Sequence, residues 1–254
     1  MKINNMFVKI GVIISVYNEY ENVMKNIRII NKNLFPIVLI QSDPNNLDKI
    51  IDSNLVNYYQ IFPDIVGTEN LFTEDAKKTI SHPLSRNISH AFTVTSSFDV
   101  DWWIVLLGDM KIHNFDGIEK IINKMESQKK SLAITREIGL TFTNKFGKYG
   151  KVEKSDSHNF VPTFFIVSAK LVKKGIFQNI RVTNPFAMEE CMGDAATKFF
   201  NDNNYDFFEQ CYIIADYAYP KFIEGLEYNK DRTILPRYVD GIVNAFRRFK
   251  TKFH

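Results

Sequence analysis

Several short polar and acidic residues follow directly after apolar stretches of the sequence. A carboxylate in such a place can accept a hydrogen bond from a nucleobase or a ribose hydroxyl, or bind a divalent metal on a diphosphate. Because the carboxyl ends of parallel strands meet at one edge of a sheet, we expect these side chains to share a nucleotide site. The residues are Ser15, Tyr17, Asn18, Glu19, Ser42, Asp43 and Asp109.

The apolar stretches before them have the pattern of buried strands. Lys9–Val16, Pro36–Ile40 and Trp102–Leu107 are apolar on both faces, which is typical of parallel strands covered by helices. Between the first two, Tyr20–Ile30 has apolar residues at helical spacing. The alternation predicts an α/β fold with a mostly parallel central sheet flanked by helices.

The rest of the chain adds less regular elements, and no repeat or linker divides it. Strands are predicted at Val56–Phe62, Leu132–Thr135, Thr163–Ser168 and Phe207–Ala215, and helices at Leu47–Asn54, Leu84–Ser97, Phe115–Met125, Ala169–Gly175 and Asp194–Asn201. One compact domain is therefore expected.

The composition excludes several classes of protein. The chain has 254 residues, 45% of them apolar, and a net charge of +3, so no nucleic-acid partner is expected. The two cysteines match no metal or redox spacing, which predicts a reduced, cytoplasmic setting. The sequence contains no run of about 18 apolar residues, so no membrane span is expected. The glycine-rich signatures of dinucleotide-binding and P-loop proteins do not occur.

Four sequence blocks carry a family resemblance. VIISVYNEYEN, VLIQSD, LSRN and WIVLLGDM occur in the order found in family 2-like glycosyltransferases of the GT-A fold. The chain resembles that family well over residues 8–115 and more loosely to about residue 215. The resemblance implies a single GT-A (Rossmann-like) domain that uses a nucleotide-diphosphate sugar as donor and a saccharide or lipid-linked acceptor.

The resemblance also implies roles for individual residues. Val16, Tyr17 and Glu19 would border the nucleotide, with Tyr17 near the base. Asp43 would take the acidic place that binds the edge of the base. Arg86, within the block LSRN, would face the diphosphate or the ribose.

Asp109 occupies the place of the family's metal-binding acids, which implies Mn²⁺ or Mg²⁺ as a cofactor. The family usually has two acids there, separated by one residue, whereas this chain has only Asp109 in the run Gly108–Lys111. The single acid puts metal dependence in question. A literal Asp-x-Asp occurs at Asp99 and Asp101, but it precedes the strand and is expected at the wrong edge of the sheet.

A carboxylate that deprotonates the acceptor hydroxyl is needed for an inverting transfer. In the family this acid lies at the start of a late helix. Asp194 matches the family's spacing best, and Glu190 is the alternative because Glu189 and Glu190 imitate the family's acidic pair. Spacing alone does not decide between them.

The C-terminal end has a different character from the rest. Residues 1–220 are expected to form the GT-A domain, with 1–115 as the nucleotide-binding half and 116–220 as the acceptor half. Residues 221–254 form a basic tail whose last part, Arg237–His254, is amphipathic at helical spacing. This helix is expected to pack on the core or, as a second hypothesis, to contact an anionic membrane surface.

The main hypothesis is therefore an inverting glycosyltransferase of glycan or polysaccharide synthesis. The alternative is a non-catalytic relative that binds a nucleotide sugar or a glycan as a scaffold, and the reduced metal motif favours it. A nucleotidyltransferase usually carries a basic, glycine-rich N-terminal loop, and the run SVYNEYEN is not one.

Overall fold

The fold was analysed in a computed structural model, which describes residues 2–3, 6–16, 19–42, 51–62, 83–136, 158, 160–178, 180, 188–216 and 223–228. The strands are β1 (Lys2–Ile3), β2 (Met6–Phe7), β3 (Ile10–Val16), β4 (Ile37–Ser42), β5 (Tyr58–Phe62), β6 (Trp102–Leu107), β7 (Met110–Ile112), β8 (Leu132–Arg136), β9 (Phe160–Ser168), β10 (Cys211–Asp216) and β11 (Leu226–Tyr228). The helices are α1 (Tyr20–Lys32), α3 (Pro83–Val94), α4 (Asp116–Ser127), α5 (Ala169–Lys173), α6 (Met188–Asp202) and α7 (Phe207–Gln210), with 3-10 turns η1 (Ser53–Leu55) and η3 (Thr95–Ser97).

Seven strands form the central sheet, in the order β10-β8-β9-β6-β3-β4-β5. Strands β6, β3, β4 and β5 are parallel neighbours, and β8 and β10 form a second parallel pair. Strand β9 runs antiparallel to both β6 and β8 and joins the two groups. The predicted α/β class with a mostly parallel central sheet is confirmed.

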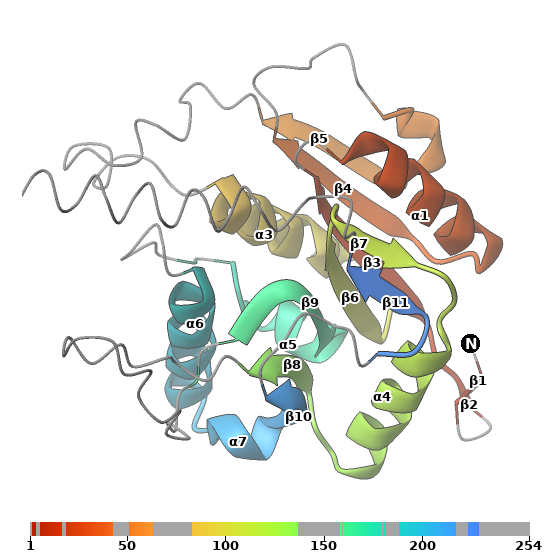
Figure 1. Ribbon diagram of the computed structural model, residues 1–254. Coiled ribbons are helices and arrows are strands. Elements are labelled where there is room, and N and C mark those ends of the chain that lie inside the picture. The colour runs from red at the N-terminus through yellow and green to blue at the C-terminus, as the bar shows by residue number, and fades with distance from the viewer. Residues whose placement is uncertain are drawn as a thin grey trace, which may run out of the picture.

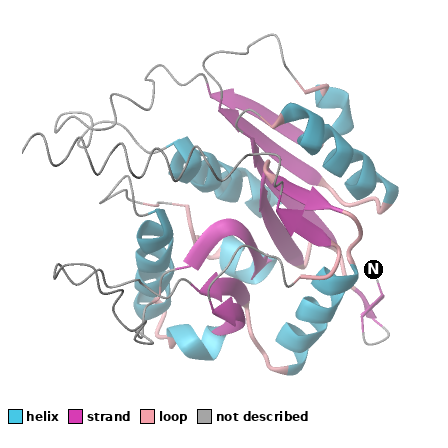
Figure 2. Cartoon of the chain, viewed as in Figure 1, coloured by secondary structure: helices cyan, strands magenta, loops and turns pink. Residues whose placement is uncertain are grey.

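Helices cover both faces of the sheet, as Figures 1 and 2 show, with α1 and α4 on one side and α3 and α6 on the other. Strand β3 is buried on both faces because successive side chains point in opposite directions. Val12 and Ile14 join the core cluster beneath α1 and α4, whereas Ile13 joins the cluster beneath α3 and α6. The two-sided cover explains why the strand is apolar throughout.

A small two-stranded sheet stands beside the central one. Strand β7 follows β6 after a two-residue turn and pairs antiparallel with β11, so that Met110 faces Tyr228. Backbone bonds from His113 N and Gly117 N to Gly225 O and Glu224 O, of 2.7 and 3.1 Å, fix β11 to the start of α4. Residues 223–228, which follow the expected domain boundary at residue 220, therefore pack on the first half of the chain.

Some sequence predictions were wrong in detail. Phe207–Gln210 is helical rather than part of the predicted strand, because the Asp206 side chain caps the turn by accepting a 2.8 Å hydrogen bond from Glu209 N. Helix α6 begins at Met188, so Asp194 lies in its second turn and not near its first residue. Helix α5 ends at Lys173, two residues before the predicted end, and Gly175 follows the C-cap with a left-handed φ of 96°.

Two predicted helices fall partly or wholly outside the described residues. Residues 47–50 and all of Arg237–His254 are not described, whereas Ile51 and Asp52 are not helical and Ser53–Leu55 is the 3-10 turn η1 rather than the predicted α-helix. Among the helices that are described, none has the length and apolar character needed to cross a membrane.

Candidate active site

The candidate site lies at the edge of the sheet where the parallel strands end. From β3 the chain first builds β4 and β5 on one side, and then returns to place β6 on the other side of β3. The change of direction makes a topological switch point between the ends of β3 and β6. Ligands of open α/β sheets bind in the crevice at such a point.

Asp109 lies in the turn that follows β6, beside this switch point. Asp109 is buried, with only 7% of its surface exposed to solvent. The preceding residue is fixed to the end of β3, since Gly108 N donates a 2.8 Å hydrogen bond to Ser15 O. A Cβ on Gly108 would stand 3.2 Å from Glu19 Cβ, so the backbone next to Asp109 packs against the start of α1. The structure therefore places Asp109 and Glu19 on adjoining turns.

The Asp-x-Asp run lies at the opposite edge, as the sequence predicts. Asp101 Oδ2 accepts a 2.8 Å hydrogen bond from Lys9 N, just before β3 begins. Asp99 forms an exposed ion pair with the Lys9 ammonium group, which holds the pKa of that carboxyl below its ordinary value. These acids are a surface link between the starts of two strands, away from the candidate site.

Arg86 lies beyond the ends of β4 and β5, on helix α3. Its Nη2 donates a 3.2 Å hydrogen bond to Ser42 Oγ. Its guanidinium carbon is 4.7 Å from the centre of the Phe62 ring, within the range of a cation–π contact. The side chain is half-buried, so a cation is held between two strand ends beside the predicted nucleotide site.

A buried amide next to Arg86 joins the same strands. Asn87 Nδ2 donates hydrogen bonds to Ser15 Oγ at 3.1 Å and to Ser42 Oγ at 2.5 Å. Ser15 and Ser42 are thereby linked across β3 and β4, and the start of α3 is anchored to the edge of the sheet. Asn87 fixes where its neighbour Arg86 stands.

A cavity of about 340 Å³ opens beside Arg86. His90, one turn further along α3, forms a 2.8 Å hydrogen bond with the Tyr58 hydroxyl and stacks edge-on against Phe62 at 5.0 Å. Burial lowers the pKa of His90 below its ordinary value. The residues that line the cavity are Phe62, Arg86, Ser89, His90, Thr93, Gln178 and Ile180.

The other residues predicted to border the nucleotide are only partly described. Val16 has no exposed surface, and its side chain belongs to the core under α1 and α4. Glu19 is half-buried and precedes the first residue of α1. Tyr17 and Asp43 lie outside the described residues.

Both candidate bases lie on α6. This helix leads through α7 into the start of β10, so its own first turn is directed toward the edge that holds Asp109. Asp194 is exposed, on the side of the helix away from buried Met192 and Ala196. Glu190 lies in the first turn, and its side chain is outside the described part.

The residues present fit a metal only if the substrate completes the coordination. Within the described ranges, no group of three or more His, Cys, Asp or Glu side chains could hold an ion. Asp109 supplies a buried carboxylate at the switch point, and Glu19 lies on the adjoining turn. Mg²⁺ commonly keeps several waters and binds through one or two carboxylates plus substrate phosphates, and one Asp with a diphosphate satisfies that pattern.

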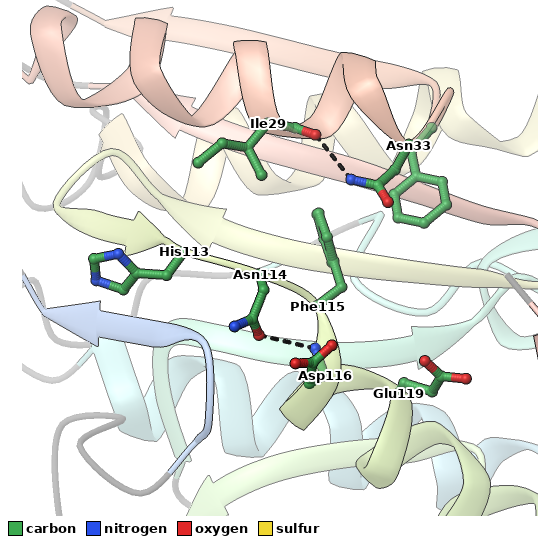
Figure 3. Close-up of a pocket in the computed structure, with 8 residues that line it drawn as sticks. Ile29, Asn33, His113, Asn114, Phe115, Asp116 and Glu119 are labelled. Atoms are coloured by element: carbon green, nitrogen blue, oxygen red, sulfur yellow. Dashed lines mark hydrogen bonds between the residues drawn. The ribbon is translucent and has the colours of Figure 1, made fainter.

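A second cavity, of about 300 Å³, lies at the other end of α1 and is not part of this edge. Figure 3 shows Asn33 donating a 2.9 Å hydrogen bond to Ile29 O on one wall, and Asn114 Oδ1 accepting one of 3.1 Å from Asp116 N on the other. The first bond lies at the C-terminal end of α1 and the second at the start of α4. This cavity therefore lies at the junction between the two helices.

Three asparagines with a clear structural role were missed by the sequence analysis. Asn22 and Asn26 lie on the buried face of α1, beside Val23 and Ile27, and Asn87 is the last residue of the block LSRN. Polar residues at the apolar positions of a helix were the available signal. A buried amide needs hydrogen-bond partners, so such positions mark a backbone or side chain that the helix must hold.

Neither a protein-family model nor a curated protein sequence matches the chain. Among solved structures, the chain resembles apo mouse xyloside xylosyltransferase 1, with 13% identity, 82% of this chain and 85% of that chain covered, and a TM-score of 0.38. It also resembles the mannosyltransferase PcManGT from Pyrobaculum calidifontis in complex with GDP-Man and Mn²⁺, with 10% identity, 88% and 61% covered, and a TM-score of 0.45. Structural similarity at this level gives no evidence about activity.

Proposed function

We propose that this protein is a glycosyltransferase that moves a sugar from a nucleotide-diphosphate donor to an acceptor hydroxyl. The observation that carries the proposal is the position of Asp109, beside Glu19 at the switch point between β3 and β6. Arg86 supports it from beyond the ends of β4 and β5. An acid on one side and a cation on the other suit a nucleotide diphosphate lying across the strand ends.

In the proposed reaction the acceptor oxygen attacks the anomeric carbon of the sugar, and the bond from that carbon to the diphosphate oxygen breaks. A bound Mn²⁺ or Mg²⁺, held by Asp109, would supply charge neutralisation for the leaving diphosphate. Arg86 would contribute a fixed positive charge to the same group. The half-buried position of the guanidinium against Phe62 strengthens that attraction, because water screens it less than on an open surface.

The proton of the acceptor hydroxyl passes to a carboxylate on α6, and attack opposite the leaving group inverts the anomeric centre. Asp194 and Glu190 both remain candidates for this base. The direction of α6 toward the site edge favours a residue in its first turns. The acceptor is proposed to be a saccharide or a lipid-linked saccharide, and the basic tail to contact an anionic membrane from a cytoplasmic location.

A donor screen tests the proposal. The protein is incubated with UDP- and GDP-activated sugars, Mn²⁺ and candidate acceptors, and release of the free nucleoside diphosphate is followed by chromatography. Asp109→Asn is expected to lower release at least a hundredfold, in the range for removal of one charge-stabilising group. Asp101→Asn is the matched control, since Asp101 lies at the opposite edge and Asn can still accept from Lys9 N. Equal activity of the two variants would refute the site.

The second candidate function is a non-catalytic protein that binds a nucleotide sugar or a glycan. The run Gly108–Lys111, which has one acid where the family usually has two, favours it. Binding of a nucleotide sugar raises the melting temperature by mass action in either case. A shift that is not accompanied by release of free nucleotide with any acceptor would support the binding protein over the enzyme.

A further inference from the structure

The buried face of α1 carries two amide side chains four residues apart. Asn22 and Asn26 are 6% and 1% exposed, and their apolar neighbours Val23 and Ile27 have no exposed surface. Burying an amide without hydrogen-bond partners is unfavourable, so amides are retained in such places when they bind another group. Residues at this spacing lie above one another on a helix and can grip one extended segment.

The segment they hold is the turn that contains Asp109. Asn22 Nδ2 donates to Gly108 O at 2.6 Å and to Met110 O at 2.7 Å, the carbonyls immediately before and after Asp109. One amide group therefore fixes the backbone on both sides of the acid. The turn connects β6 to β7, whose edge toward α1 has no neighbouring strand among those described.

Asn26 extends the same contact along β7. Its Nδ2 donates to Met110 O at 2.6 Å, and its Oδ1 accepts a 2.9 Å hydrogen bond from Ile112 N. The side chain thus replaces the strand that would otherwise pair with this edge of β7. Strand β11 occupies the other edge, so β7 is held on both sides (Figure 1).

From these contacts we propose that Asn22 is a positioning residue for the Asp109 carboxylate, with Asn26 as its support. The inference rests on the proposed function, because it assigns the orientation of the acid toward a donor diphosphate and its divalent metal. A carbonyl on each side of Asp109 bound to one rigid amide leaves the acid little backbone freedom. Groups that orient a metal-binding side chain affect metal affinity even though they do not touch the ion.

The experiment measures nucleotide affinity rather than turnover. Calorimetry gives the dissociation constants of UDP and GDP with and without MnCl₂, at a temperature where every variant keeps its near-ultraviolet dichroism. Asn22→Ala is expected to weaken the Mn²⁺-dependent affinity about ten- to a hundredfold. Ile30→Ala is the matched control, because it destabilises the same helix from a fully buried position remote from Asp109. The nucleotide affinity of Ile30→Ala should stay within about twofold of the wild type, because Ile30 is packed in the core and does not hold the turn that contains Asp109.

A double-mutant cycle separates positioning from general weakening. If Asn22 acts through Asp109, then Asn22→Ala should cause no further loss of Mn²⁺-dependent affinity in the Asp109→Asn background. Asn22→Ser, whose hydroxyl still satisfies one carbonyl, replaces Asn22→Ala if that variant fails to fold.

Each outcome of these affinity measurements supports or overturns the positioning role of Asn22. Wild-type affinity in the Asn22 variant, an equal loss in Ile30→Ala, or a full additional loss in the Asp109→Asn background would overturn the positioning role and leave the proposed function standing. Absence of Mn²⁺-dependent binding of either nucleotide to the wild type would overturn the proposed function itself, and the positioning role with it.

Discussion

Asn87 Nδ2 lies 2.5 Å from Ser42 Oγ, and this contact ties the start of helix α3 to the end of strand β4. The same nitrogen also reaches Ser15 Oγ on the neighbouring strand. One buried side chain therefore links a helix and two strands at the edge where the candidate site lies. Its consequence for stability can be measured without any knowledge of the ligand.

Asn87→Ala should lower the free energy of unfolding by about 1–3 kcal/mol, because it leaves two buried hydroxyls without this donor. Urea denaturation followed by circular dichroism measures the change. Thr93→Ala, at an exposed position of the same helix, should cost under about 0.5 kcal/mol. Similar losses for the two variants would contradict the bridging role of Asn87.

Arg86 should be required for affinity toward a nucleotide diphosphate. Arg86→Ala is expected to weaken UDP or GDP binding about tenfold or more, since hydrogen bonds to charged groups contribute about 1.5–3 kcal/mol. Arg86→Lys should restore little, because an ammonium group cannot keep both the planar contact with Phe62 and the bond to Ser42. Calorimetry measures the affinities, with exposed Arg28→Ala on α1 as the control. Unchanged binding in Arg86→Ala would remove Arg86 from the site.

Gly11 should resist substitution because it faces the Trp103 ring. A Cβ at this position would stand 2.7 Å from Trp103 Cε3, much closer than carbon atoms normally approach. Gly11→Ala should therefore cost about 1–3 kcal/mol of unfolding free energy by overpacking. In the Trp103→Leu background the added methyl group has room, so the cost of Gly11→Ala should largely disappear. Additive losses in denaturant titrations would count against this steric account.

His90 should make the protein less stable as the pH falls. Burial lowers the pKa of His90 in the folded protein, so the unfolded chain takes up the proton first. Stability therefore decreases as the pH falls from about 6.5, the ordinary pKa of histidine, toward 5. His90→Gln should flatten this part of the profile, measured as melting temperature against pH. Thr93→Ala should leave the slope unchanged, and a wild-type slope in His90→Gln would contradict the assignment.

The sequence predicted those parts of the fold that depend on local apolar pattern. Trp102–Leu107 has the same bounds in the structure as in the prediction, because a strand buried on both faces needs a continuous apolar run. Strand β7 could not be predicted in this way. It has three residues, and its partners are side chains of α1 and a strand near residue 226, all distant in sequence.

The candidate site was predicted in part for the same reason. Asp109 and Arg86 were found because they follow or accompany recognisable blocks, and the structure brings both to the strand-end edge. The buried amides Asn22, Asn26 and Asn87 were missed because their role is visible only when the segments they bind are placed. Sequence patterns indicate which residues could react, whereas the residues that position them can be identified only from the packing in the folded structure.

The pairing of β7 with β11 has a consequence for how the protein is made. Residues Leu226–Tyr228 are translated long after Met110–Ile112, and a domain emerging from the ribosome forms contacts only with what has already been synthesised. The outer edge of β7, next to Asp109, therefore cannot pair with β11 until residues 226–228 have been synthesised. A nascent chain that ends before Leu226 would carry Asp109 beside an edge of β7 that β11 does not yet cover.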